Sequence, residues 1–265
     1  MKTTLSIAGS DSGGGAGIQA DIKTFCAHGV FGTTVVTAIT AQNTVLVSGV
    51  LDVETKMIEQ QLDAVFSDIF PDAVKIGMLS SPEIMLAVAG KLQQWGAKNI
   101  VLDPVMVAKS GDLLMRDDAV EVLKTTLVPL CCVLTPNIPE AERLTGLEIK
   151  TLDDMHVVAR AIHKMGCGAV VLKGGHLDNE VCTDLLFDGK NFYTFQSARV
   201  KTKNTHGTGC TFSSAIAANL SLGFGLQEAV NRAKTYITAA IKTAPNIGRG
   251  NGAINHSPHN KLCKC

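Results

Sequence analysis

The chain alternates between short apolar runs and longer segments in which apolar residues recur at helical spacing. The apolar runs are rich in β-branched residues and are soon followed by Gly, Asp, Asn or Pro; they cover residues 5–8, 33–39, 73–76, 100–102, 131–134 and 169–172. Helical spacing is found between them, at 18–27, 55–66, 83–95, 119–127 and 155–165. Continuous apolar strands that alternate with helices indicate an α/β fold, with a central, mostly parallel sheet covered by helices on both faces.

The rest of the chain extends this pattern without a second domain. Residues 183–187 and 192–196, joined by the turn 188–191, predict a hairpin added to the sheet. A last helix is expected at 226–242. Beyond Pro245 the composition turns to Gly, Asn, His and Lys. We therefore predict one domain over residues 1–245 and a loosely ordered tail over 246–265.

Composition limits the classes of function. Of 265 residues, 46% are hydrophobic and only 5% aromatic, and 25 are glycine, which fits an enzyme with tight loops. The 24 basic and 24 acidic residues balance, so neither nucleic acid nor an acidic membrane is the expected partner. The apolar stretch before Gly9 is too short for a signal sequence or a membrane span, and a cytoplasmic protein is expected.

The eight cysteines suggest reduced thiols rather than a disulfide framework or a zinc site. In a cytosolic chain of this length most of them are expected to be reduced and buried. No Cys-x-x-Cys pair occurs, and Cys131 and Cys132 lie in an apolar run. Cys263 and Cys265 fall in the expected tail.

The most specific short motif is the sequence HGTGCT at residues 206–211, which leads into a run where Phe212, Ile216 and Leu220 share one helical face. A flexible loop that opens a helix presents unpaired N–H groups and partial positive charge, and so attracts phosphate. Cys210 in that field is expected to have a lowered pKa and to be partly thiolate. An ordinary glycine-rich turn with a small buried cysteine is the alternative.

Polar residues or glycines follow the predicted strands at five places, namely residues 9–11, 77–78, 103–104, 136–137 and 173–175. Ligands of open α/β sheets bind outside the carboxyl ends of the strands. Any one of these sites alone is explained by a turn, but five together predict one shared cleft.

The glycines at residues 9–17 lie between the first strand and a helix. They do not keep the G-x-G-x-x-G spacing of a dinucleotide site, and no Walker A lysine follows. What remains is a backbone that a ligand can approach closely. Asp21, one helical turn further on, either faces the same cleft or is a solvated first-turn acid.

Oxygen and ammonium groups at other strand ends fit a metal–phosphate site. Asp103, Asn137 and Glu140 offer the oxygen ligands that Mg²⁺ prefers, although Asn137 also suits a helix N-cap. Lys173 is placed to hold a nucleotide phosphate. Lys234, in the last helix, either reaches the same phosphates or lies on a solvated face.

Several motifs together resemble the hydroxymethylpyrimidine/phosphomethylpyrimidine kinases, the thiamine-pathway branch of the ribokinase-like superfamily. They are residues 8–21, 75–79, 103–106, 135–137 with Glu140, and 206–212, in family order, and the resemblance runs from about Leu5 to Lys242. It implies a ribokinase-like fold, ATP and Mg²⁺ as cofactors, a homodimer, and phosphorylation of 4-amino-5-hydroxymethyl-2-methylpyrimidine and then of its monophosphate.

The resemblance also implies roles for single residues. Cys210 stands where most sugar and nucleoside kinases of the superfamily carry an Asp base. The backbone of Gly207, Thr208 and Gly209 would stabilise the transferring phosphoryl group. The remaining roles are Glu140 and, through water, Asp103 for the metal; Asn137, Lys173, Thr208 and Lys234 for ATP; and Gln42, Gly9, Asp21, Met78 and Val105 for the pyrimidine.

Gln42 supports the pyrimidine over the closest rival substrate. One amide pairs with both the amino group and the ring nitrogen of an aminopyrimidine. Pyridoxal kinases of the same fold tend to have an apolar residue at that position, and they are the first alternative. A catalytically silent nucleotide- or pyrimidine-binding sensor is the second. A nicotinamide-dependent dehydrogenase, the third, rests only on the N-terminal glycines.

Overall fold

The computed structural model describes residues 1–106, 115, 117–175 and 180–258. Within them the chain forms one sheet of nine strands in the order β3-β2-β1-β4-β5-β6-β7-β8-β9. The six strands from β2 to β7 in this order run parallel, whereas β3 pairs antiparallel with β2, β8 with β7, and β9 with β8. The strands are β1 (Thr3–Asp11), β2 (Phe31–Gln42), β3 (Val47–Asp52), β4 (Ala73–Ile76), β5 (Ile100–Leu102), β6 (Val133–Leu134), β7 (Val170–Leu172), β8 (Val181–Phe187) and β9 (Phe192–Ala198).

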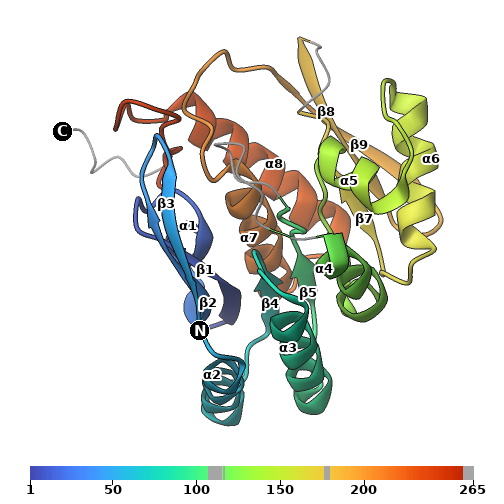
Figure 1. Cartoon of the computed structure of the whole chain (residues 1–265). Helices are drawn as coiled ribbons and strands as arrows, with labels where there is room; N and C mark the ends of the chain where they lie inside the picture. The colour runs from blue at the N-terminus through green and yellow to red at the C-terminus, as the bar shows by residue number, and fades with distance from the viewer. Residues whose placement is uncertain (107–114, 116, 176–179, 259–265) are drawn as a thin grey trace.

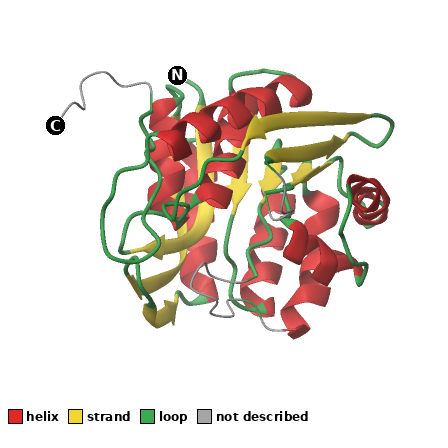
Figure 2. Cartoon of the chain, turned by 90° about the horizontal axis from the view of Figure 1, so that it is seen from above, coloured by secondary structure: helices red, strands yellow, loops and turns green. Residues whose placement is uncertain are grey.

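Helices cover both faces of this sheet (Figure 1; Figure 2). One face carries α1 (Gly17–Ala27), α7 (Thr208–Ser221) and α8 (Leu226–Lys242). The other carries α2 (Thr55–Asp68), α3 (Pro82–Trp95), α4 (Asp117–Val122), α5 (Ile138–Thr145) and α6 (Leu152–His163). The expected α/β architecture is confirmed, and each of the six predicted apolar runs contains or overlaps a strand.

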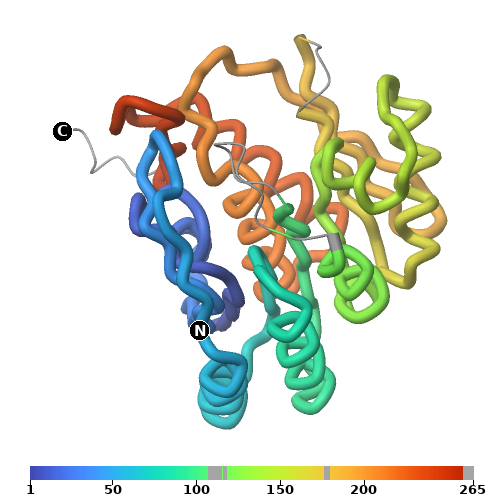
Figure 3. The backbone as a smooth tube through the Cα atoms, in the orientation of Figure 1, coloured from blue at the N-terminus to red at the C-terminus, as the bar shows by residue number. Residues whose placement is uncertain are grey.

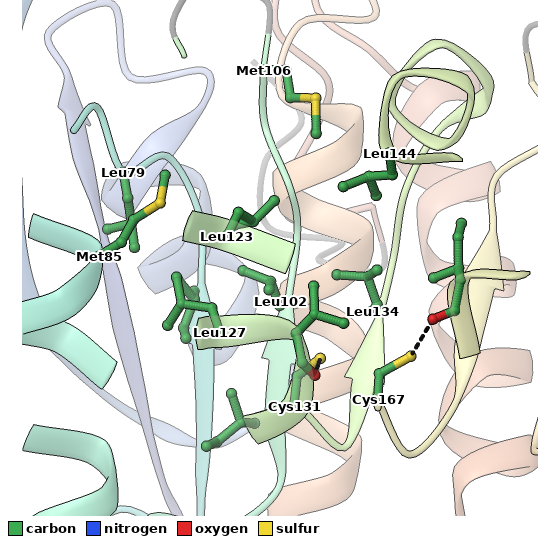
Figure 4. Close-up of a cluster of buried hydrophobic side chains, with 14 of the residues drawn as sticks. Leu79, Met85, Leu102, Met106, Leu123, Leu127, Cys131, Leu134, Leu144 and Cys167 are labelled. Atoms are coloured by element: carbon green, nitrogen blue, oxygen red, sulfur yellow. Dashed lines mark hydrogen bonds between the residues drawn. The ribbon is translucent and has the colours of Figure 1, made fainter. Parts of the chain in front are cut away.

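Successive residues of the central strands point to opposite cores, as period-two geometry requires. In β5, Leu102 packs into the cluster under α3 and α5, whereas its neighbour Val101 packs into the cluster under α7 and α8. Figure 4 shows the first cluster, where Leu102 and Leu134 of the sheet meet Leu127 from the turn that continues α4. Burial on both faces explains why these strands are continuously apolar.

The helix ends follow from local sequence. Ser81 accepts the backbone N–H of Ile84 at the start of α3, and Gly96 ends that helix in the left-handed region at φ 62°. Thr151 and Asp154 form a capping box at the start of α6. Each device satisfies backbone groups that a helix end leaves unpaired.

The edge strand β3 was not expected from the sequence. It pairs antiparallel with β2 and exposes nearly all of its side chains, with Leu51 68% exposed. A short strand with no buried face has neither the continuous apolar run nor the alternation that marks a strand in sequence.

The chain remains packed beyond the predicted domain boundary at residue 245. Ile254 is 2% exposed, and the Tyr236 hydroxyl donates to the His256 carbonyl at 2.6 Å. The expected loosely ordered tail therefore does not begin at residue 246, because an apolar residue and backbone hydrogen bonds hold this segment on α8. Cys263 and Cys265 lie outside the described residues.

Two further features concern the thiols and the helices. The described cysteines are free thiols: Cys26, Cys131, Cys132, Cys167, Cys182 and Cys210. In the part of the chain that the structure covers, every helix is too short or too polar to cross a bilayer.

The buried His256 side chain makes a prediction about acid stability. Burial, with the nearby charges of Lys23 and His206, lowers its pKa from 6.5 to about 4. The unfolded chain takes up a proton below pH 6.5 and the folded protein does not, so stability falls as pH drops from 6.5 to 4. The loss amounts to about 3 kcal/mol at most.

Urea unfolding of wild type and His256→Gln across this range measures the effect as a difference between two curves. We expect the wild type to lose stability more steeply than the variant. Parallel pH dependences would contradict the buried neutral imidazole.

Candidate active site

The described residues enclose one large cleft, of about 920 Å³, at the carboxyl ends of the parallel strands. Its lining includes residues that follow β1, β2, β4, β5 and β7, and also the first turns of α5 and α7. The predicted convergence of polar strand ends on one cleft is therefore observed. The antiparallel β8–β9 hairpin and α8 close its other side.

The loop that carries Cys210 is built around Gly207. Gly207 is the N-cap of α7 with φ 79°, and a Cβ there would collide with the carbonyl oxygen of Gly15. Only glycine fits a left-handed residue in so close a contact. The Thr208 hydroxyl donates to the Thr205 carbonyl at 2.7 Å. The amides of Gly209 and Cys210 thus lie in the first turn, where a helix offers them no intrahelical acceptor.

Asp11 joins this loop to the N-terminal glycine loop. Its carboxylate accepts N–H groups from Gly13 at 2.8 Å, Gly15 at 3.1 Å and Ala16 at 2.8 Å. It also contacts Nε2 of His206 at 2.8 Å. Burial opposes ionisation, but the hydrogen bonds from His206 and the two amides of Ala16 and Gly13 outweigh it and lower the Asp11 pKa. A buried carboxylate therefore fixes both loops.

Cys210 borders the cleft, but its thiol is not the thiolate that the sequence predicts. Burial raises its pKa from 9.0 to about 11. The charge of Lys75 and the Gly17 amide pull the pKa down, while Asp21 and Asp103 push it up. Desolvation and two carboxylates outweigh the Lys75 charge and the Gly17 amide, so the prediction of a lowered pKa is wrong.

Asp21 lies beneath the cleft rather than facing it. It is fully buried and forms an ion pair with Lys75 at 2.9 Å, itself fully buried. The hydroxyls of Ser6 at 2.5 Å and Ser214 at 2.6 Å also donate to it. Every lone-pair direction is taken by the protein, so neither the predicted substrate contact nor the alternative of a solvated acid holds for Asp21.

Lys173 lies near both of the carboxylates that the sequence predicts as metal ligands. Its ammonium lies 2.7 Å from Asp103 and 3.9 Å from Glu140. Burial raises the Glu140 pKa to about 7, with Asp103 adding to the rise and Lys173 and Asn137 opposing it. A Cβ on Gly209 would lie 3.4 Å from both Lys173 Nζ and Asp103 Oδ2, which places this cluster against the Cys210 loop.

Asn137 does serve as a helix cap. Its side chain accepts the Glu140 N–H at 2.9 Å, and Glu140 in turn accepts the Asn137 N–H at 2.8 Å, which completes a capping box for α5. Both residues still line the cleft. The cap fixes the Glu140 carboxylate in place, so the two interpretations of Asn137 are compatible.

Lys234 is held inside the protein. Its ammonium pairs with Asp184 at 2.8 Å and donates to the Cys182 carbonyl at 3.2 Å. The other oxygen of Asp184 accepts the Gly174 N–H at 3.0 Å. Lys234 borders the cleft but is not on a solvated face, and it supports the backbone that follows Lys173.

The predicted pyrimidine residues also line the cleft, except for Asp21. Gln42, at the end of β2, accepts the Thr40 hydroxyl at 3.1 Å through its side-chain oxygen. Met78 and Val105 line the same space. A Cβ on Gly9 would lie 3.6 Å from the Met78 methyl carbon, so that glycine leaves room beside an apolar wall.

Sequence reasoning missed the roles of four charged or titratable side chains that line the cleft and hold its loops together. Asp11, Lys75, Asp184 and His206 each contribute an ion pair or a charged hydrogen bond. Asp11 and His206 lie inside glycine-rich motifs, in which the glycines give the stronger sequence signal. Lys75 offered one signal, because a lysine inside the apolar run 73–76 is expected to have a buried partner.

Comparison with known proteins is consistent with this geometry. The family described as phosphomethylpyrimidine kinase matches residues 11–255. A hydroxymethylpyrimidine/phosphomethylpyrimidine kinase of Rhizobium meliloti is 53% identical over 95% of this chain and 96% of its own length. A thiamine biosynthesis bifunctional protein of Geobacter sulfurreducens is 55% identical over 96% of this chain, which spans 52% of that longer protein.

Solved structures share the fold. Phosphomethylpyrimidine kinase from Clostridium difficile superposes with a TM-score of 0.82 at 50% identity, over 91% of this chain and all of that one. The ADP complex of Bacillus subtilis pyridoxal kinase gives 0.91 at 41% identity, over 97% and 98% of the two chains. Fold and site together define a ribokinase-like small-molecule kinase. Within that class, the chain belongs to the phosphomethylpyrimidine kinase family.

The raised pKa of Cys210 predicts slow alkylation. In the ligand-free protein, peptide-resolved labelling with iodoacetamide is expected to show an inflection near pH 11 at Cys210, because only the thiolate reacts. The exposed Cys26 gives an internal reference for reagent and exposure. An inflection at Cys210 below pH 8 would instead support the thiolate that the helix terminus suggests.

Proposed function

We propose that this chain transfers the terminal phosphoryl group of ATP to 4-amino-5-hydroxymethyl-2-methylpyrimidine and then to the resulting monophosphate, in thiamine biosynthesis. The observation that carries the proposal is that Gln42, Cys210 and the Lys173–Asp103 pair line one cleft. Membership of the family and the names of its relatives support the same reaction. A homodimer, which the resemblance implies, and the cytoplasmic location expected from the N-terminal sequence belong to this proposal.

Cys210 is assigned the role of base in the first transfer. The thiol starts protonated and first releases its proton to solvent, and the Lys75 ammonium beneath it stabilises the thiolate form. The thiolate then accepts the hydroxyl proton of the pyrimidine as that oxygen bonds to the terminal phosphorus and the bond to ADP breaks. The amides of Gly207, Thr208, Gly209 and Cys210 are assigned to the oxygens of the transferring group.

The nucleotide end of the cleft is assigned to Asn137, Lys173 and Thr208, with Lys234 holding the backbone after Lys173 through Asp184. This assignment is supported by the ammonium of Lys173, which lines the cleft and is held there by Asp103 at 2.7 Å. The relative solved with ADP supports a nucleotide as the donor.

Glu140 and Asp103 are the residues that would hold Mg²⁺. The described residues contain no cluster of three or more His, Cys, Asp or Glu side chains suited to a metal. A pair of carboxylates still fits Mg²⁺, which binds through one or two acids together with phosphate oxygens and water. The raised pKa of Glu140 shows that its charge lacks full compensation. Mg²⁺ supplies Lewis-acid stabilisation of the phosphates and offsets the carboxylate charge.

Removal of the base is expected to separate the two transfers. Cys210→Ala should lower kcat for the pyrimidine alcohol by roughly 10²–10⁴-fold, with little change in pyrimidine affinity. The monophosphate is already ionised at neutral pH and needs no base, so its transfer should lose less. Steady-state kinetics with both acceptors measure the two effects side by side.

Cys210→Ser is the matched control, because it keeps the approximate size of the side chain and replaces the thiol by a hydroxyl, which is a weaker acid. It should resemble the alanine variant in kcat. Wild-type kcat for the alcohol should rise with pH because more of Cys210 is then thiolate, and this rise should be absent from both variants. Equal losses in the two transfers would contradict this division of labour, and near-wild-type turnover would remove Cys210 from the chemistry.

Pyridoxal kinase activity is the second candidate, because a pyridoxal kinase superposes over nearly the whole chain. The Gln42 amide decides between the two substrates. Gln42→Met should lower kcat/KM for the pyrimidine alcohol by about 10-fold or more, because buried polar groups of that substrate lose their hydrogen-bond partner. The same substitution should lower kcat/KM for pyridoxal far less. A coupled assay with the alcohol, its monophosphate and pyridoxal tests this. A larger loss for pyridoxal would favour the alternative.

A further inference from the structure

The segment 246–256, here called the C-terminal strap, returns from α8 to the cleft without entering it. Figure 3 shows it beside the end of the β2–β3 hairpin. It contributes none of the described residues that line the large cleft. We propose that the strap positions the turn that carries Gln42 against the loop that carries Cys210. This inference rests on the function proposed above.

One side of the strap binds the turn after Gln42. The Asn251 N–H donates to the Thr44 carbonyl at 2.8 Å, and the Gly250 N–H to the Thr44 hydroxyl at 3.2 Å. Asn43 closes the same turn, because its side chain accepts the N–H groups of Val45 and Leu46. The strap therefore holds a turn that begins directly beside the predicted specificity residue.

The other side of the strap binds the chain that leads into Cys210. The His206 N–H donates to the Gly252 carbonyl at 3.0 Å. The Asn204 side chain donates to Asn246 at 2.7 Å. His206 is also the partner of Asp11, so the strap meets the glycine loops at the residue that joins them. One short segment thus contacts both functional loops.

Three alternate glycines make these contacts possible. A Cβ on Gly248 or Gly250 would collide with Thr44, and a Cβ on Gly252 would collide with the Asn204 side-chain oxygen. Glycine at every second residue therefore marks close contact on both loops, and not a flexible linker. The glycine-rich composition, from which the sequence predicts a loose tail, is instead what lets this segment pack closely on its neighbours.

The end of the strap is anchored independently of the loops. Ile254 is buried in the cluster under α7 and α8, and the Asn255 N–H donates to the Ala240 carbonyl at 3.1 Å. The Tyr236 hydroxyl holds the carbonyl of His256. Because its far end is fixed on α8, the strap transmits a definite position to Thr44 and His206.

Alignment is what phosphoryl transfer depends on. A pyrimidine held by Gln42 must present its hydroxyl to the sulfur of Cys210, and a misplacement of about 1 Å can cost about 10²-fold in rate. The Ser12 hydroxyl already bridges the backbone N–H and carbonyl of Gln42, both at 2.8 Å. The strap adds the second link, from the far side of the turn. Thr44 and Gly250 are thus positioning residues.

Two variants test the strap. Gly250→Ala forces the strap away from the Thr44 carbonyl, and Thr44→Val removes only the acceptor of the Gly250 N–H. Gly90→Ala is the control, because a Cβ at this glycine of α3 meets open space. We expect kcat/KM for the pyrimidine to fall by about 10–100-fold in Gly250→Ala and less in Thr44→Val, with KM for ATP within about 2-fold of wild type.

Hydrogen exchange supplies the readout independent of activity. In Gly250→Ala, amides of residues 42–47 and 204–208 should exchange faster together, whereas Gly90→Ala leaves them unchanged. Faster exchange confined to 246–256, or an equal loss for ATP and pyrimidine, would overturn the strap's role. If Gly250→Ala fails to fold, Thr44→Val takes its place in the test. The strap's role is then overturned if Thr44→Val matches the wild type both in its kinetics with the pyrimidine and in its hydrogen exchange. A wild type that phosphorylates no pyrimidine instead refutes the proposed function, and the exchange result still decides the coupling.

Discussion

The site depends on the carboxylate of Asp11. This single buried charge accepts three amides of the N-terminal glycine loop and pairs with His206, which lies 195 residues further along the chain. At this junction Gly207 packs so closely on Gly15 that a Cβ on Gly207 would collide with the Gly15 carbonyl oxygen. If this carboxylate were removed, each buried N–H group would lose its acceptor, at a cost in folding free energy of about 1–3 kcal/mol for each group. Loop geometry around Cys210 is therefore enforced by electrostatics at a distance from the reacting atoms.

Buried charges under the cleft are arranged as compensated pairs. Lys75 with Asp21 and Lys173 with Asp103 each bring one positive and one negative charge near Cys210. Pairing is what makes such burial tolerable. It also leaves little net positive field at the sulfur, so desolvation decides the pKa of the thiol. A helix terminus read from sequence reports only one contribution to that balance.

The sequence predicted the features that local patterns encode, such as strands and their polar ends. It missed the features that depend on contacts between residues far apart in the chain. The sheet followed from continuous apolar runs, since strands buried on both faces, such as β4 and β5, carry that signature. The cleft followed from polar strand ends. Asp21 was misplaced because its partners Ser6, Lys75 and Ser214 come from three other elements. The strap was misjudged because its glycines mark contacts with Thr44 and Asn204, which no local pattern reveals.

A thiol that rests in its neutral form suits this particular cleft. Asp103 and Glu140 already concentrate negative charge around Lys173, and burial together with Asp103 raises the pKa of Glu140 despite that lysine. A carboxylate at position 210 would place a third anion beside the phosphates of the donor. Cysteine keeps the first turn of α7 free of fixed negative charge, so its amides remain available to an anionic ligand. The first transfer then needs the thiolate only while the proton moves, and the second does not need it at all.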